Sequence, residues 1–96
     1  MAITLYTQTH CTYCEIMKSK LDKTGYVYYV INIQEDPKAL AFMKAQGHRT
    51  VPQLYVNDNH VNKKNTQDYT SEELYKLISE SLDRWAWQDS GVEQGI

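Results

Sequence analysis

Hydrophobic and polar residues follow two different periods along the chain, and the period-two segments predict β-strands. These segments are rich in β-branched and aromatic residues and are bounded by polar or glycine-containing stretches. A tight turn at Asp58-Asn59 separates the last two and predicts that they pair antiparallel. The predicted strands are 2–7, 26–32, 53–57 and 60–61, and the tyrosine-rich run 26–29 is expected to lie in the sheet core.

Apolar residues that recur every three or four positions predict three helices. The first covers 12–24. The second covers 37–46, with Asp36 as its expected N-cap and Pro37 in its first turn. The third begins at a capping box, in which Thr70 is the N-cap and Glu73 stands three residues later. One apolar face marks this last helix: Leu74, Leu77, Ile78, Leu82 and Trp85.

The predicted order of elements is β-α-β-α-β-β-α. A right-handed crossover makes the first two strands parallel, and the tight turn makes the last two antiparallel. The pattern therefore predicts an α/β protein with a four-stranded mixed sheet flanked by three helices. We expect one domain over residues 1–87 and a flexible C-terminal tail over 88–96.

Composition narrows the possible partners. The 96 residues carry a net charge of −2 without a polybasic tract, so neither nucleic acid nor an anionic membrane is the expected main partner. No apolar stretch reaches the 18 or so residues of a membrane span, and the N-terminus lacks the pattern of a signal peptide. These features predict a cytoplasmic protein, in which thiols are kept reduced.

Both cysteines of the chain stand in one Cys-x-x-Cys motif. Cys11 and Cys14 follow the first predicted strand and open the first predicted helix. The N-terminus of a helix stabilises a thiolate, so the pKa of Cys11 should fall below the free value of about 8.5. Cys14 lies one turn further in and should be more buried. The motif therefore predicts a redox-active dithiol, with Cys11 as nucleophile and Cys14 as resolving thiol.

A second motif, Thr50-Val51-Pro52, precedes the third predicted strand. A cis peptide bond before Pro52 is plausible in such a rigid turn. Val51 would then present its backbone N–H and C=O to an extended peptide beside Cys11.

Together these motifs resemble the glutaredoxin family of the thioredoxin superfamily. The resemblance covers roughly residues 2–82 and rests on Tyr6, the Cys-x-Tyr-Cys ending of the first motif, and Thr50-Val51-Pro52. Lys18 also occupies a position where glutaredoxins commonly carry lysine. The resemblance implies the thioredoxin fold and a reductase of protein disulfides and glutathione mixed disulfides. It also implies glutathione as reductant, ribonucleotide reductase as a common client, and a monomer.

The resemblance further implies where glutathione binds. The groove is formed by the cysteines, by the Thr50 motif and by the loop before the last helix. Mapped onto this sequence, the expected glutathione and substrate residues are Gln8, Tyr13, Arg49, Thr50, Val51, Pro52, Thr66, Gln67 and Asp68.

Three departures from the family pattern point to a diverged glutaredoxin, of a type that also occurs in phages. Gln8 replaces a lysine that contacts a glutathione carboxylate, and Arg49 is the candidate substitute. The loop 62–68 lacks the usual Gly-Gly pair. Thr12 replaces a proline, and family members without that proline more often bind an iron–sulfur cluster between two subunits.

Three alternatives remain open from the sequence. One is a dimer that holds an iron–sulfur cluster through Cys11 of each subunit, and another is a small donor reduced by thioredoxin reductase. The third is a zinc site, which needs four ligands and finds no second Cys-x-x-Cys motif. Histidines 10, 48 and 60 show no spacing typical of zinc ligands.

Overall fold

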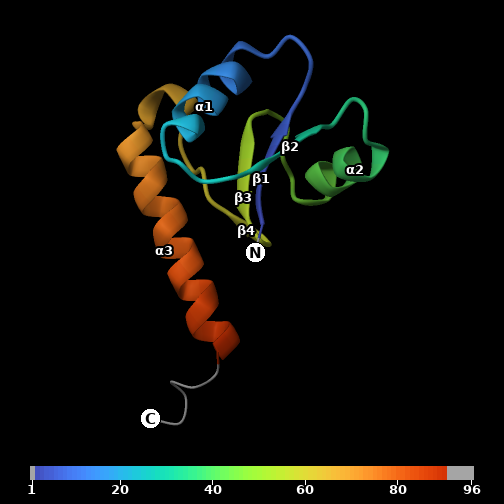
Figure 1. The fold of residues 1–96 in the computed structure, drawn as a ribbon. Helices are drawn as coiled ribbons and strands as arrows, with labels where there is room; N and C mark the ends of the chain where they lie inside the picture. The colour runs from blue at the N-terminus through green and yellow to red at the C-terminus, as the bar shows by residue number, and fades with distance from the viewer. Residues whose placement is uncertain (1, 91–96) are drawn as a thin grey trace.

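A computed structural model describes residues 2–90, with side chains described as far as residue 83 (Figure 1). It confirms the predicted fold class, a mixed four-stranded sheet with three α-helices in this part of the chain. The elements are β1 (Ile3–Thr7), α1 (Thr12–Asp22), β2 (Tyr29–Asn32), α2 (Pro37–Ala45), β3 (Gln53–Val56), β4 (Asn59–His60), the short 3₁₀ helix η1 (Thr66–Asp68) and α3 (Ser71–Ser90).

The strands lie in the order β2-β1-β3-β4. β1 pairs with β2 in parallel, so that Leu5 lies opposite Val30, and with β3 antiparallel, so that Leu5 lies opposite Leu54. β3 and β4 form an antiparallel hairpin. The carboxyl end of β1 leads directly into the loop that carries Cys11, so the centre of the sheet supports the cysteine motif.

One face of the sheet packs against α1 and α3 and forms the main core. Alternate residues of β1 and β3 point to this face, and the helices contribute aliphatic side chains that are completely buried. Removing about 25 cal/mol per Å² of apolar surface from water makes this cluster the main stabilising feature of the fold. Its members are Ile3, Leu5, Met17, Leu21, Leu54, Val56, Val61, Tyr69, Leu74 and Ile78.

The opposite face is aromatic. Tyr6 from β1 and Tyr55 from β3 meet at a ring-centroid distance of 5.7 Å, and Phe42 from α2 lies 5.6 Å from the first and 5.3 Å from the second. His48 and His60 extend this cluster toward β4, with their own centroids 4.6 Å apart. The face beneath α2 is therefore the more polar one, and it carries two titratable side chains.

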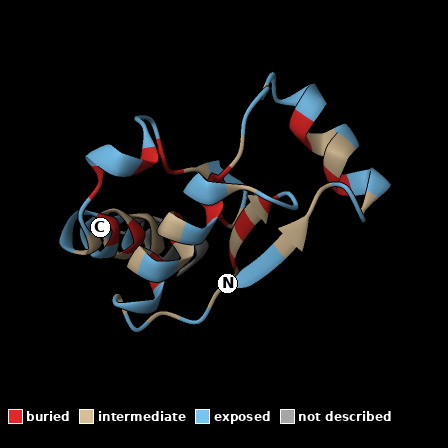
Figure 2. Cartoon of the chain, turned by 90° about the horizontal axis from the view of Figure 1, so that it is seen from above, coloured by how far each residue is buried: buried red, intermediate tan, exposed pale blue. Residues whose placement is uncertain are grey.

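The second strand is shorter and more exposed than its sequence predicts. Instead of 26–32 it covers Tyr29–Asn32, and it forms the edge of the sheet (Figure 2). Tyr26 and Tyr28 pack against the core from outside the strand, whereas Val27 is 86% and Tyr29 is 63% exposed. The expectation that this tyrosine-rich run lies in the sheet core is wrong, because β-propensity cannot distinguish an edge strand from a central one.

Several boundaries also differ from the prediction by one or more residues. The hairpin turn consists of Asn57-Asp58, one residue earlier than expected, and Asn57 takes a left-handed conformation with φ of 55° that asparagine tolerates well. Helix α3 continues to Ser90, past residue 87 where the domain was expected to end. Residues 91–96 of the expected tail, and the side chain of Trp85, lie outside the part that is described.

The capping box predicted for α3 is present. The Glu73 N–H donates to the Thr70 hydroxyl, and the Thr70 N–H donates to the Glu73 carboxylate, each over 3.0 Å. Among the described residues, no helix combines the length and the apolar character that crossing a membrane requires.

Candidate active site

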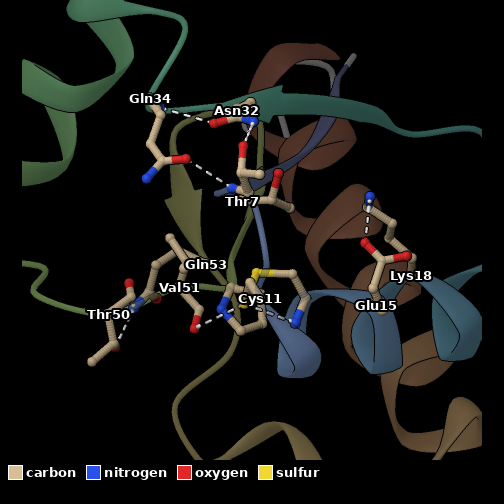
Figure 3. The surroundings of a disulfide bond; sticks show 12 residues. Thr7, Cys11, Glu15, Lys18, Asn32, Gln34, Thr50, Val51 and Gln53 are labelled. Carbon is tan, nitrogen blue, oxygen red and sulfur yellow. Dashed lines mark hydrogen bonds and ion pairs between the residues drawn. A yellow bond between two sulfur atoms is a disulfide. The ribbon is translucent and has the colours of Figure 1, made fainter.

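The loop between β1 and α1 presents Cys11 at the end of the sheet. The Thr9 N–H donates to the Gln34 side chain over 3.0 Å, and the Asn32 amide donates to the Thr9 hydroxyl over the same distance. Asn32 in turn accepts from the Gln34 N–H over 2.9 Å. The end of β2 therefore fixes the approach to the cysteines (Figure 3).

Cys11 and Cys14 form a disulfide, with their Cα atoms 5.2 Å apart. Cys11 is the N-cap of α1, and its sulfur accepts the Cys14 N–H over 3.1 Å. The Cys14 side chain is fully buried and that of Cys11 is partly exposed, as the sequence predicted. In the reduced protein the same N–H and the dipole of α1 favour a thiolate at Cys11, the sulfur that an incoming disulfide can reach.

Val51 lies on the other side of the Cys11 sulfur. Its carbonyl oxygen is 4.0 Å from that sulfur, and the peptide bond between Val51 and Pro52 is cis, as expected (Figure 3). The side-chain amide of Gln53 donates to the Thr50 carbonyl over 3.0 Å and closes this turn. A peptide lying along Val51 would therefore be in contact with the reactive sulfur.

A groove of about 290 Å³ begins beside Tyr13 and continues along the Thr50–Pro52 turn to the start of η1. The Tyr13 ring is half exposed and is free to contact a ligand. Of the predicted ligand residues, the groove brings together Tyr13, Thr50, Val51, Pro52, Thr66 and Gln67. Asp68 follows in the same turn but does not line the groove, which is completed by Asn62, Lys64 and Asn65.

Gln8 and Arg49 line a second pocket, of about 370 Å³, on the side of Thr50 and Val51 that faces α2. This pocket has an apolar floor that includes Leu40 and Met43, and Lys44 and Arg49 supply positive charge. The two pockets share only the Thr50-Val51 backbone among the residues that line them. A ligand that contacts both Arg49 and Gln67 would have to cross this ridge.

Asn62 anchors the loop that replaces the expected Gly-Gly pair. Asn62 is buried. Its side-chain oxygen accepts the Leu54 backbone N–H over 2.8 Å, and its side-chain amide nitrogen donates to the Pro52 carbonyl over 3.1 Å. The loop is thereby attached to the same turn that approaches Cys11. Sequence reasoning missed Asn62, because its signal is only a polar residue directly after an apolar strand.

Two further side chains hold this loop. The buried hydroxyl of Tyr69 accepts the Lys63 N–H over 2.7 Å and the Lys64 N–H over 3.3 Å. The Lys20 ammonium, on α1, donates to the Thr66 carbonyl over 2.9 Å. Hydrogen bonds from side chains therefore give the loop a defined course without glycine.

Lys64 and Glu73 form an ion pair of 3.0 Å at the far end of the groove, and the ammonium lies 4.9 Å from the centre of the Tyr69 ring. Hydrogen bonds from the Thr70 backbone and from Lys64 lower the pKa of Glu73. The same carboxylate raises the pKa of Lys64. Both groups are exposed, so the pair contributes little to the stability of the fold.

Lys18 pairs with Glu15 over 3.0 Å, one turn along α1 from the cysteines (Figure 3). Glu15 therefore partly neutralises the positive charge that Lys18 carries near the cysteine motif. Within the described residues, no group of three or more His, Cys, Asp or Glu side chains is arranged to hold a metal ion.

A four-stranded mixed sheet with a Cys-x-x-Cys disulfide at the start of its first helix defines a redox protein with the thioredoxin fold. The sequence model of the glutaredoxin family matches residues 3–61. The chain therefore belongs to the glutaredoxin family, whose members are thiol oxidoreductases.

Curated relatives and solved structures support this assignment. The chain is 33% identical over 58 residues to the glutaredoxin-like protein NrdH of Escherichia coli K12, which covers 60% of this chain and 72% of that protein. The structure of Escherichia coli NrdH-redoxin, described as having a thioredoxin-like activity profile, aligns with a TM-score of 0.59 at 32% identity, over 62% of this chain and 79% of that one.

A glutathione complex of buckwheat glutaredoxin shares the fold. It aligns with a TM-score of 0.61 at 21% identity, over 81% of this chain and 76% of the buckwheat chain. At this low identity, the buckwheat structure supports only the assignment of the fold.

Proposed function

We propose that this protein reduces protein disulfides and glutathione mixed disulfides with glutathione as its reductant. The observation that carries the proposal is the position of Cys11, which is partly exposed and lies between the N-terminus of α1 and the carbonyl of Val51, a residue that lines a ligand-sized groove. Sites for small ligands usually enclose about 300–1,000 Å³, and this groove is close to the lower limit.

In the reaction, the Cys11 thiolate attacks one sulfur of a client disulfide and releases the other as a thiolate. The Cys14 thiolate then attacks the Cys11 sulfur, which releases the second client thiolate and forms the Cys11–Cys14 disulfide. Two glutathione thiolates restore the dithiol in two exchanges and leave as glutathione disulfide. Because α1 stabilises the Cys11 thiolate, Cys11 is a good leaving group when the second glutathione thiolate attacks the glutathione sulfur of the Cys11–glutathione mixed disulfide.

The groove offers contacts that suit a short peptide with charged ends. The Val51 backbone is available for strand-like pairing, the Tyr13 ring for apolar contact, and the Lys64 ammonium for a carboxylate. Thr66 and Gln67, at the start of η1, are the proposed contacts of the γ-glutamyl end, with Asp68 beside them. Gln8 and Arg49 would contact the other carboxylate only if the ligand reaches over the Thr50-Val51 ridge.

The proposal also covers the oligomeric state, the cellular location and the client protein. We propose a monomer that acts in the cytoplasm, where glutathione is available, with ribonucleotide reductase as a candidate client. Membership of the family supports the proposed client and location, and the net charge of −2 gives no reason to add nucleic acid or membrane.

A second reductant is also a candidate. The solved NrdH-redoxin is described as thioredoxin-like in activity, and Gln8 supplies no charge for a glutathione carboxylate. In that case thioredoxin reductase would reduce the Cys11–Cys14 disulfide directly, by the same pair of exchanges.

One coupled assay separates the two reductants. Wild type and Cys11→Ser are assayed for reduction of a disulfide substrate, first with glutathione and glutathione reductase, then with thioredoxin reductase. We expect turnover with glutathione in wild type and none in Cys11→Ser. Turnover with thioredoxin reductase alone would replace the proposed reductant by the second one. Activity retained in Cys11→Ser would refute the nucleophile assignment.

A further inference from the structure

The pocket on the α2 side of the Thr50–Val51 ridge has an apolar floor. It encloses about 370 Å³, more than the groove beside Tyr13, and its lining includes Ile33, Leu40 and Met43. Because a thioether side chain is flexible, Met43 allows this floor to adapt to apolar groups of different shapes. The glycine end of glutathione has no side chain and would leave such a floor in contact with water. The pocket therefore suits a ligand that carries an apolar side chain.

Two cations stand at the same pocket. Lys44 and Arg49 both line it and both are exposed, and none of the other residues that line it is acidic. Both ion pairs found within the described residues involve other lysines, so neither cation is paired with a carboxylate of that part of the chain. In a chain with a net charge of −2 this is a local excess of positive charge, and it suits an anionic group at the edge of the pocket.

The pocket lies beside the path of a bound client. Val51 lines it, and the Val51 carbonyl oxygen is 4.0 Å from the Cys11 sulfur. A client segment that pairs with the Val51 backbone therefore has its own half-cystine at Cys11 and its neighbouring residues beside the pocket. An extended strand advances about 3.3 Å per residue, so the residues that reach the pocket are those within about two positions of the client cysteine.

We propose that this pocket is the client subsite of the protein: its floor binds an apolar side chain next to the client cysteine, and Lys44 and Arg49 bind an acidic side chain beside it. The favoured clients are then disulfides in extended segments where apolar and acidic residues flank the cysteine. This inference rests on the proposed function in one respect, since it assumes that the protein reduces protein disulfides. It assigns the pocket to the client and not to glutathione, and it requires no particular reductant.

The test uses the reduced protein itself as the reductant of symmetric peptide disulfides. The Cys11 thiolate attacks one sulfur and releases one peptide thiolate, and the Cys14 thiolate then releases the second and forms the protein disulfide. In the three peptides compared, the cysteine is flanked on both sides by leucine then glutamate, by leucine then lysine, or by serine then glutamate. Peptide released after acid quenching gives the rate constant. Each rate constant is divided by that of the same peptide with dithiothreitol, which removes the effect of the neighbouring charges on the disulfide itself.

In wild type at low salt, we expect the leucine–glutamate peptide to react about fivefold faster than either of the others, because it gains both an ion pair and apolar burial. The net charge of −2 would by itself favour the lysine peptide, so a preference for glutamate has to come from the pocket. Equal corrected rates, or a preference for the lysine peptide, would overturn the proposal and leave the proposed function intact. No reaction with any peptide would overturn both.

Variants of α2 assign these preferences to the pocket. Lys44→Gln should lower the preference for glutamate over lysine to about twofold, and Leu40→Gln should remove the preference for leucine over serine. Lys38→Gln and Ala41→Gln are the matched controls, because both residues are exposed on α2 and neither lines the pocket; both variants should keep the wild-type preferences. Preferences that survive in Lys44→Gln and Leu40→Gln, or that are lost equally in the controls, would overturn the proposal. Lys44 is exposed, so its variant should fold and keeps the test valid if Leu40→Gln does not.

Glutathione disulfide is the last probe, because it distinguishes a client subsite from a glutathione subsite. The reduced protein is mixed with glutathione disulfide in the same way as with the peptides. We expect Lys44→Gln to slow this reaction less than it slows the reaction of the leucine–glutamate peptide. A loss as large with glutathione disulfide as with the peptide would assign the pocket to glutathione and overturn the proposal.

Discussion

The redox centre and the loop 62–69 are built in opposite ways, although both border the same groove. Cys11 and Cys14 depend on backbone: a strand end, a helix N-terminus and one N–H within the motif itself. The loop depends on side chains from distant elements, including Lys20 from α1 and Tyr69 from the approach to α3. The cysteine site is therefore built mainly from local backbone, with Asn32 and Gln34 holding the loop before it, whereas the groove loop depends on distant side chains.

This difference implies that the two regions respond separately to mutation. A change at the cysteines should remove a chemical step and leave the groove intact. A change at a loop anchor should weaken binding and stability, and leave the chemical step intact.

The largest effect should come from Cys14→Ser. Cys11 then still forms mixed disulfides, but an external thiol must resolve them in place of an intramolecular one. We expect reduction of protein disulfides to fall at least about a hundredfold, because the advantage of a fixed neighbour is lost. Initial rates with a protein disulfide measure this. Exchange of a glutathione mixed disulfide, which needs only Cys11, is the control reaction and should change little.

Asn62→Ala should have the next largest effect. It leaves the buried Leu54 N–H and Pro52 carbonyl unpaired, which should lower the free energy of unfolding by about 2–3 kcal/mol. Urea denaturation measures the loss. Asn65→Ala is the matched control, because this asparagine lines the groove, is exposed and makes no capping hydrogen bond with its side chain. Equal losses in both variants would contradict the anchoring role of Asn62.

Lys20→Met should weaken ligand binding with little effect on chemistry. The methionine keeps most of the apolar stem but cannot donate to the Thr66 carbonyl, so the start of η1 loses its link to α1. We expect KM for the glutathione substrate to rise about fivefold, which corresponds to roughly 1 kcal/mol. Lys23→Met, at the C-cap of the same helix, removes an exposed ammonium and is the control. A kcat that falls while KM stays constant would contradict the separation of the two regions.

The smallest effect should be the acid dependence of Glu73. Its folded pKa lies below its ordinary value, so its contribution to stability is present above the unfolded pKa of about 4.5 and is lost as pH falls through the folded pKa. Thermal unfolding of wild type and Glu73→Gln at pH 7 and pH 3 measures this. The melting temperatures should differ at pH 7 and converge at pH 3. A constant difference would mean that the carboxylate charge contributes nothing.

The parts that sequence predicts well are those fixed by neighbouring residues. The capping box at Thr70 and Glu73, the N-cap at Asp36 and the asymmetry of Cys11 and Cys14 all follow from local chemistry, and the structure confirms them. The order of strands also follows, because crossover handedness and a tight turn leave few arrangements.

The parts that sequence misses depend on distant contacts. Nothing in the sequence distinguishes Asn62 and Lys20 from other polar residues. Only the fold brings the first beside Pro52 and the second beside Thr66. The tyrosine-rich run before residue 30 has the composition of a central strand, but only the fold shows that most of it precedes β2 and that β2 is an edge strand. Arg49 adjoins Thr50 in sequence, yet its side chain faces the pocket on the other side of the ridge from Tyr13.

The position of loop 62–69 makes it a candidate segment for exchange between related proteins. The match to the glutaredoxin family ends at residue 61, one residue before this loop begins. A designed graft at that junction would exchange one wall of the ligand groove while keeping the dithiol unchanged. The hydrogen bonds that hold the loop decide whether such a graft folds. Asn62 and Tyr69 lie within the grafted segment, whereas Lys20 lies on α1 of the recipient, so the graft must keep a carbonyl that Lys20 can reach.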